Sequence, residues 1–222
     1  MDISVTDSKQ TPLEYVVMGG TFDPVHNGHI QSAKQLVSTL GYDHIYLMPC
    51  GDAYHKQGVT QLDHRVAMLQ LAIKDSVSLK LDLRETLREG ATYTVDTLTQ
   101  LRQELGKEAH ISWVVGTDAA KGLVNWHQWQ QVFEQANVIV IHRAGVPLDH
   151  SVTNAWPAKP CSDGQAFKQI PSGAFMQVAL EPFDISSTEI REAINQKQSV
   201  DDHVPQAVLN YIEQHGLYRG NH

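Results

Sequence analysis

The sequence predicts an α/β fold: a doubly wound, Rossmann-like parallel sheet with helices on both faces. Two observations predict it. Short apolar runs typical of strands alternate with longer segments whose leucines, alanines and valines recur at helical spacing. A glycine-rich turn, GGTFDPVHNGHI (19–30), joins the first run to the first helical segment. Strands joined by helical crossovers lie parallel and are covered on both faces, so the alternation indicates layers of helix, sheet and helix.

The individual elements follow from the same periodicities. The expected strands are YVVM (15–18), HIYLMP (44–49), SLKLDL (78–83), HISWVV (110–115), NVIVIH (137–142) and FMQVAL (175–180). The expected helices are 28–40, 62–75, 93–105, 128–136, 186–196 and a last one that begins near Pro205. Serine and threonine at the start of 186–196 are typical of helix caps.

The length of 222 residues suits one domain spanning 1–222. Residues 1–13 are polar and are expected to form an N-terminal extension. Prolines and glycines interrupt every short apolar group between 144 and 174, which indicates an irregular insertion.

Composition excludes several classes of protein. The formal net charge is −8 and no basic stripe is visible, so we expect no nucleic-acid partner. The apolar runs are too short to cross a bilayer, and the polar start lacks the pattern of a secretory signal, so we expect no membrane association and a cytoplasmic location. Cys50 and Cys161 lack metal-ligand spacing and are expected to be reduced thiols without a role.

The turn at 19–30 is either structural or a phosphate site. Gly19 and Gly20 would let backbone approach a ligand, Thr21 adds a hydroxyl, and the following helix directs free N–H groups at the carboxyl end of the sheet. His26 and His29, three apart, would share one helix face and could both donate to phosphate oxygens. Zinc bound by these two histidines would lack a third ligand nearby. The stretch matches neither G-x-G-x-x-G nor a P-loop.

These residues carry a resemblance to a known family. GGTFDP followed by HNGH, together with ISSTEIR (185–191), resembles the nucleotidyltransferases of the HxGH type. HK at 55–56, TYTVDTL (92–98), VVGTDAAKGLVNWHQW (114–129) and YIEQHGLYR (211–219) make the chain more similar to the bacterial nicotinate mononucleotide adenylyltransferases. Tyr54 stands where that family has a proline.

The resemblance implies a reaction: ATP and nicotinate mononucleotide give nicotinate adenine dinucleotide and pyrophosphate, a step in NAD biosynthesis. It implies His26, His29 and Arg191 as catalytic residues. The ATP site that it implies consists of Gly19, Gly20, Thr21, Phe22, His26, His29, Gly116, Asp118, Ile185, Ser187, Thr188 and Arg191. Magnesium would be carried with ATP, and no protein metal site is expected. Ser187 and Thr188 could also cap their helix.

The acceptor site implied by the resemblance lies elsewhere in the chain. Thr94 and the backbone N–H of His127 would bind the nicotinate carboxylate, Trp126 would stack on the pyridine ring, and Lys56 would contact phosphate. Two other functions stay open from the residues alone: a related transferase with another acceptor, such as phosphopantetheine or a phosphorylated alcohol, and a nucleotide-binding module without catalysis. The oligomeric state is open.

Overall fold

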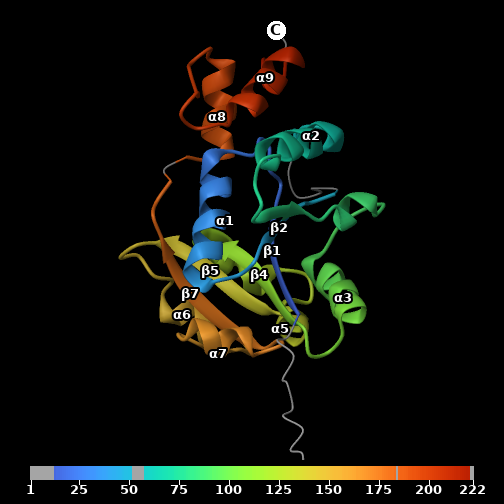
Figure 1. The fold of residues 1–222 in the computed structure, drawn as a ribbon, viewed down its shortest axis with the longest axis vertical. Helices are drawn as coiled ribbons and strands as arrows, with labels where there is room; N and C mark the ends of the chain where they lie inside the picture. Colours follow the sequence, from blue (N-terminus) through green and yellow to red (C-terminus); the bar gives the residue numbers. More distant parts are fainter. Residues whose placement is uncertain (1–12, 52–57, 184, 221–222) are drawn as a thin grey trace, which may run out of the picture.

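The computed structural model describes residues 13–51, 58–183 and 185–220, and it confirms the predicted α/β fold. Seven parallel strands form one sheet in the order β3-β2-β1-β4-β5-β7-β6 (Figure 1). The strands are β1 (Glu14–Gly20), β2 (Ile45–Pro49), β3 (Leu79–Leu81), β4 (His110–Gly116), β5 (Asn137–Arg143), β6 (Lys159–Pro160) and β7 (Ala174–Leu180).

Helices lie on both faces of this sheet. The α-helices are α1 (Asn27–Leu40), α2 (Leu62–Ile73), α3 (Thr94–Leu105), α4 (Thr117–Gly122), α5 (Trp129–Gln135), α6 (His150–Thr153), α7 (Gly164–Lys168), α8 (Ser187–Asn195) and α9 (Gln206–Gln214). Two short 3-10 helices are η1 (Arg84–Leu87) and η2 (Leu123–Asn125). Figure 1 shows α2, α8 and α9 together at one end of the molecule.

Two apolar clusters, one on each face of the sheet, account for the layers. In β1, Val16 and Met18 face one cluster and Val17 faces the other, because successive side chains of a strand point to opposite faces. The first cluster is covered by α1, α2, α7, α8 and α9, and the second by α3, α4 and α5. Since both faces are buried, the central strands read as continuous apolar runs.

The strand order creates a crevice at the carboxyl ends of β1 and β4. From β1 the chain runs outward through β2 and β3, then returns to the other side of β1 and continues through β4, β5 and β7. Ligands of open α/β sheets bind where the strand order reverses in this way. Here β1 ends at Gly20 and β4 ends at Gly116.

Some elements differ from the sequence prediction. The strand expected at 78–83 is only Leu79–Leu81, because the Asp82 carboxylate accepts hydrogen bonds from the Arg84 backbone N–H and the Tyr15 hydroxyl and the chain leaves the sheet there. Helix α4 has six residues, too few to show a period. The segment expected to be irregular, 144–174, contains α6, the edge strand β6 and α7.

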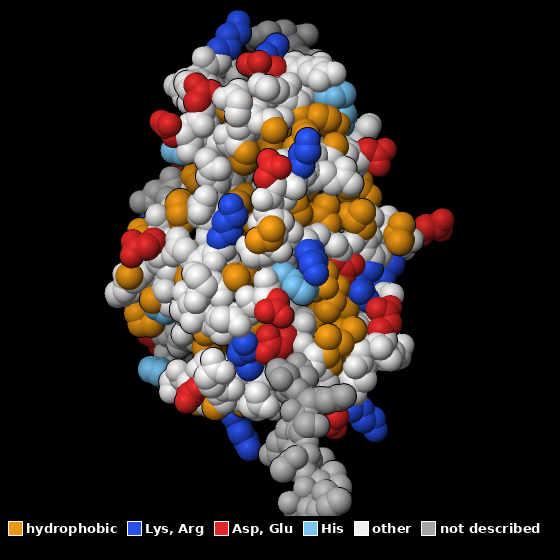
Figure 2. All heavy atoms as spheres, viewed as in Figure 1, with side chains coloured by type: hydrophobic (Ala, Val, Ile, Leu, Met, Phe, Trp, Pro, Cys, Tyr) orange, Lys and Arg blue, Asp and Glu red, His pale blue; other side chains and the backbone are white. Residues whose placement is uncertain are grey.

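The surface charge and the helix lengths of the described residues bear on the expectations from composition. On the face shown in Figure 2, lysines and arginines lie scattered among aspartates and glutamates, with no basic stripe among the residues drawn in colour. Within the described ranges, no helix combines the length and the apolar character needed to cross a membrane.

Candidate active site

The turn after β1 is shaped by contacts that glycine permits. A Cβ on Gly19 would lie 2.5 Å from Cζ2 of Trp113 in β4, and one on Gly20 would lie 3.1 Å from the Phe22 ring. Phe22 itself has a left-handed φ of 51° and a buried ring. The two glycines therefore make room for aromatic rings within the protein, which the local sequence did not indicate.

His26 and His29 lie together at the start of α1, as the sequence predicted. Their ring centroids are 3.7 Å apart, and the backbone N–H of His26 donates to Nδ1 of His29 at 3.4 Å. The Phe22 ring contacts His29 edge-on. The pKa of His26 is lowered to about 4, mainly by burial and to a smaller extent by the nearby His203. This ring is therefore neutral at pH 7. Nδ1 of His26 is buried and has no hydrogen-bond partner among the described residues.

Helix α8 brings the second motif to the same turn. Arg191 donates from Nη1 to the carbonyl oxygen of Asp23 at 2.7 Å and from Nη2 to Thr188 Oγ1 at 3.3 Å. The Ser187 hydroxyl donates to the carbonyl oxygen of Pro24 at 3.0 Å. Ser186 caps the helix in a reciprocal pair with Glu189, so the cap lies one residue before the serine and threonine suggested for that role.

Two cavities meet at His29. The smaller, about 340 Å³, is lined by Thr21, Phe22, Asp23, His29, Gly58, Val59, Ser187, Thr188 and Arg191. The larger, about 680 Å³, has His26, His29, Gly116, Asp118 and Ile185 among its lining residues. Hydroxyl, guanidinium and imidazole donors surround the smaller cavity, which suits an anion. The larger one has the size of a small-molecule site.

Gly116 and Asp118 lie at the carboxyl end of β4, where the sequence placed them: Gly116 is the last residue of the strand and Asp118 the second residue of α4. A Cβ on Gly116 would meet no atom within 4 Å, so this residue leaves open space at the cavity. The Asp118 carboxylate is fully exposed and lies 3.8 Å from the Lys121 amine. In the described part of the chain, no group of three or more histidine, cysteine, aspartate or glutamate side chains could hold a metal ion, which gives no support to a zinc site at His26 and His29.

The acceptor residues come from two segments that contact each other. Thr94 is the first residue of α3, and Trp126 directly follows η2. The rings of Tyr93 and His127 contact each other with centroids 4.3 Å apart and planes tilted by 34°, so the two segments are in contact. None of Thr94, Trp126 and His127 lines the two cavities at His29. Lys56 lies outside the described residues.

Arg65, which no sequence motif indicated, connects three segments near the smaller cavity by hydrogen bonds. Its side chain is buried and donates to the carbonyl oxygens of Thr21 at 2.9 Å, Cys50 at 2.9 Å, Gly51 at 2.9 Å and Thr60 at 3.0 Å. These carbonyls follow β1, follow β2 and precede α2. A guanidinium can satisfy this many acceptors because its donors are fixed in a plane.

Asp23 was also missed. Its carboxylate is buried and accepts from the backbone N–H of Thr60 at 3.1 Å and from the hydroxyl of Tyr218 at 2.7 Å. The carbonyl oxygen of the same residue accepts from Arg191. Sequence offered a signal for both partners, since GGTFDP and YIEQHGLYR are parts of the motif set, but not for their contact.

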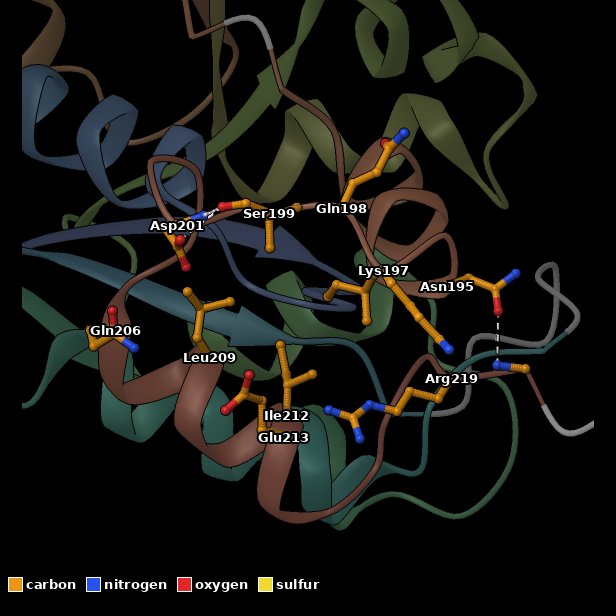
Figure 3. Close-up of a pocket in the computed structure, with 13 residues that line it drawn as sticks. Asn195, Lys197, Gln198, Ser199, Asp201, Gln206, Leu209, Ile212, Glu213 and Arg219 are labelled. Atoms are coloured by element: carbon orange, nitrogen blue, oxygen red, sulfur yellow. Dashed lines mark hydrogen bonds between the residues drawn. The ribbon is translucent and has the colours of Figure 1, made fainter.

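A third cavity of about 650 Å³ lies between α8, α9 and residues 219–220. Figure 3 shows Leu209 and Ile212 of α9 beside the charged side chains of Lys197, Glu213 and Arg219. None of the predicted site residues lines it.

The chain is similar to known proteins over most of its length. Residues 17–193 match the family model described as cytidylyltransferase-like. A protein of Dechloromonas aromatica, named "Probable nicotinate-nucleotide adenylyltransferase", is 35% identical over 92% of this chain and 97% of its own. A protein of Cellvibrio japonicus with the same name is 39% identical over 91% of this chain and 97% of its own.

Solved structures show the same fold. The nicotinic acid mononucleotide adenylyltransferase of Plasmodium falciparum, complexed with NaAD, matches 93% of this chain and 97% of its own with a TM-score of 0.73 at 19% identity. The same protein complexed with APC matches with a TM-score of 0.71. The family model and the curated relatives together show that this chain belongs to the cytidylyltransferase-like family and, within it, to the nicotinate-nucleotide adenylyltransferases.

Proposed function

We infer that this protein transfers the adenylyl group of ATP to nicotinate mononucleotide, forming nicotinate adenine dinucleotide and pyrophosphate. Its family membership supports this activity, and the relatives named above cover 92% and 91% of this chain. The observation in the structure that carries it is the position of His29. This residue lines both the smaller cavity, which is surrounded by hydrogen-bond donors, and the larger cavity.

The two cavities suit the two ends of ATP. The β and γ phosphates fit the smaller cavity, where Ser187, Thr188 and Arg191 lie at the start of α8. The adenosine fits the larger cavity beside Gly116, Asp118 and Ile185. The α phosphate then lies between them, next to His29. We propose this ring as a donor to the charge that develops there.

The reaction needs little from the protein beyond position and charge. A phosphate oxygen of nicotinate mononucleotide attacks the α phosphorus in line, a new P–O bond forms, and the bond to the β-phosphate oxygen breaks. Its electron pair leaves with pyrophosphate. The attacking oxygen is already anionic, so no general base is required. His26, neutral because its pKa is about 4, would act as a hydrogen-bonding group and not as a cation.

Magnesium fits this site as part of the substrate. Asp118 is the exposed carboxylate at the larger cavity and could approach a metal bound to phosphates. Asp23 is less suited, because each of its carboxylate oxygens already accepts a hydrogen bond from the protein. When bound, the ion neutralises phosphate charge.

The acceptor is proposed to bind where the Tyr93–His127 contact joins α3 to the turn after η2. Thr94 and the backbone N–H of His127 would donate to the nicotinate carboxylate. Trp126, half-buried, would stack on the cationic pyridine ring. Lys56 remains a proposed phosphate contact.

The activity is tested with purified protein, ATP, magnesium and a panel of acceptors, by following pyrophosphate release. Nicotinate mononucleotide is expected to give the highest kcat/KM. Equal or faster turnover of phosphopantetheine or a phosphorylated alcohol would assign another transferase. Nucleotide binding without pyrophosphate from any acceptor would identify a module without catalysis.

A further inference from the structure

The chain returns to the candidate site after its last helix. Beyond α9, Gly216 and Tyr218 both have left-handed φ angles, 61° and 60°, and the backbone N–H of Gly220 donates to Asn195 Oδ1 of α8 at 2.8 Å. Tyr218 is the unusual one, because residues with a Cβ rarely adopt this conformation. Such a conformation persists where the surrounding contacts hold it.

The contact that holds Tyr218 is its hydrogen bond to Asp23. The hydroxyl donates to Oδ1 at 2.7 Å, while Oδ2 accepts from the Thr60 backbone N–H at 3.1 Å. The Tyr218 ring also packs against the apolar cluster beneath α8 and α9. Asp23 is only 4% exposed, so water has little access to replace a lost donor.

Asp23 connects Tyr218 to the anion site through its own backbone. Its carbonyl oxygen accepts from Arg191 Nη1 at 2.7 Å, which is the shorter of the two hydrogen bonds given above for that guanidinium. The backbone N–H of Thr60 donates to the other carboxylate oxygen, and the carbonyl oxygen of Thr60 accepts a hydrogen bond from Arg65. A shift of Asp23 would therefore move the acceptor that orients Arg191 and one wall of the smaller cavity.

We propose that Tyr218 is a positioning residue of the active site: through Asp23 it orients Arg191 toward the leaving phosphates of ATP. This rests on the proposed function. It gives the closing motif YIEQHGLYR a role, since the last turn of the chain would complete the nucleotide site.

The test uses two tyrosines that differ in what their hydroxyls reach. Tyr218→Phe keeps the ring and removes the hydroxyl, and with it the hydrogen bond to Asp23 and a longer contact of 4.0 Å with Sδ of Met68. Tyr211→Phe is the matched control, because the Tyr211 hydroxyl bonds His64 Nδ1 at 2.9 Å, between α9 and α2, and lines neither cavity at His29. For each variant, the Kd of magnesium–ATP by calorimetry, the KM of both substrates, kcat and Tm are measured.

Tyr218→Phe is expected to raise the Kd and KM of ATP about tenfold, the size of one hydrogen bond to a charged group, with the KM of the acceptor within about twofold of wild type. Tyr211→Phe is expected to leave all kinetic constants unchanged. Asp23→Asn, which keeps one acceptor oxygen in the side chain, is also expected to raise the Kd and KM of ATP. In an Arg191→Lys background, the further effect of Tyr218→Phe should shrink, because the two changes act on one contact.

Equal losses of Tm in the two tyrosine variants with an unchanged Kd for ATP would overturn the proposal and leave Tyr218 a structural residue. Full additivity with Arg191→Lys would also overturn it. A wild-type protein without turnover would contradict the proposed function alone, since the calorimetric Kd still tests the role of Tyr218.

Discussion

The backbone N–H of His26 donates to Nδ1 of His29 at 3.4 Å, and the two rings contact each other with centroids 3.7 Å apart and planes tilted by 32°. Because Nδ1 of His29 accepts a hydrogen, the neutral ring carries its proton on Nε2. The helix start thus fixes both the orientation and the tautomer of His29. With the proton on Nε2, the ring can act as a hydrogen-bond donor where the two cavities meet.

His29→Asn is therefore expected to lower kcat about 10²-fold, the usual loss when one donor to developing charge is removed. The asparagine oxygen can still accept from His26, so Tm should change little. His150→Asn, an exposed residue of α6, serves as the control and should leave kcat unchanged. A His29→Asn variant with normal kcat would remove this ring from the reaction.

Arg65 offers a test of position without contact to substrate. Arg65→Lys leaves several carbonyl oxygens behind the smaller cavity without donors, so Tm should fall by roughly 5–10 °C. Small displacements of the site should also lower kcat/KM at least about tenfold.

The matched control for Arg65 is Arg102. It donates to the carbonyl oxygens of Gly106, Lys107, Ala109, Gln135 and Pro171, which precede the amino ends of β4, β5 and β7, whereas the candidate site lies at the carboxyl ends of the strands. Arg102→Lys should lower Tm by a similar amount with kcat/KM within about twofold of wild type. An equal loss of turnover in both variants would mean that stability, and not position, sets the effect.

The contrast between these arginines shows what sequence could predict. The parallel sheet with helices on both faces follows from the alternating periods, whereas its strand order does not. The resemblance pointed to GGTFDP and ISSTEIR as parts of one site because both motifs have recognisable residue types. The partners of Arg65 are backbone carbonyls on three segments, and any residue type supplies those. Gly19 depends likewise on Trp113, almost a hundred residues away, through the strand pairing of β1 with β4. The elements within 144–174 have two to five residues, too few to show a period.

Low pH should destabilise the fold through His110. This ring is fully buried, its Nδ1–H donates to the carbonyl oxygen of Ile170 at 2.8 Å, and Nε2 lies 3.0 Å from the Tyr42 hydroxyl. Burial lowers the pKa of His110 to about 4, from 6.5 in an unfolded chain. The unfolded state therefore takes up the proton first as pH falls, and stability is lost between pH 6.5 and pH 4.

The expected loss in the free energy of unfolding from His110 is roughly 2 kcal/mol between pH 7.5 and pH 5. His26, with a similar lowered pKa, adds a loss of the same sign. Urea titrations at both pH values measure it. His110→Gln should flatten the pH dependence in part, whereas His150→Gln should leave its slope unchanged. A wild-type protein equally stable at both pH values would contradict the prediction.

Arg191 should act on ATP and not on the acceptor. Arg191→Ala is expected to raise the KM of ATP or lower kcat, with the KM of the acceptor nearly unchanged. The reason is that Arg191 lines the smaller cavity, where the phosphates of ATP are proposed to bind. Both Nη atoms are already placed by Asp23 and Thr188, so a lysine cannot copy the fork. Arg191→Lys should rescue only in part, and Lys107→Ala, on the exposed surface, is the control. Full activity of Arg191→Lys would show that a point charge suffices.

Selectivity for the acid over the amide tests the acceptor residues. Nicotinate and nicotinamide mononucleotides differ only in a carboxylate against an amide, so a site furnished with donors would leave the amide NH₂ facing another donor. Such a buried mismatch costs about 1–3 kcal/mol. The acid should therefore be preferred by more than roughly tenfold in kcat/KM.

Thr94→Val keeps the shape of the first residue of α3 and removes its hydroxyl. It should lower kcat/KM for the acid more than for the amide and so narrow the ratio. Trp126→Ala should harm both acceptors alike, because stacking does not distinguish the two groups. The ratio of kcat/KM for acid and amide is the measurement for both variants. If Thr94→Val left that ratio unchanged, Thr94 would have no part in selectivity. If Trp126→Ala brought the ratio close to one, the placement of the pyridine ring on Trp126 would determine selectivity, and the donors at Thr94 and His127 would not determine it.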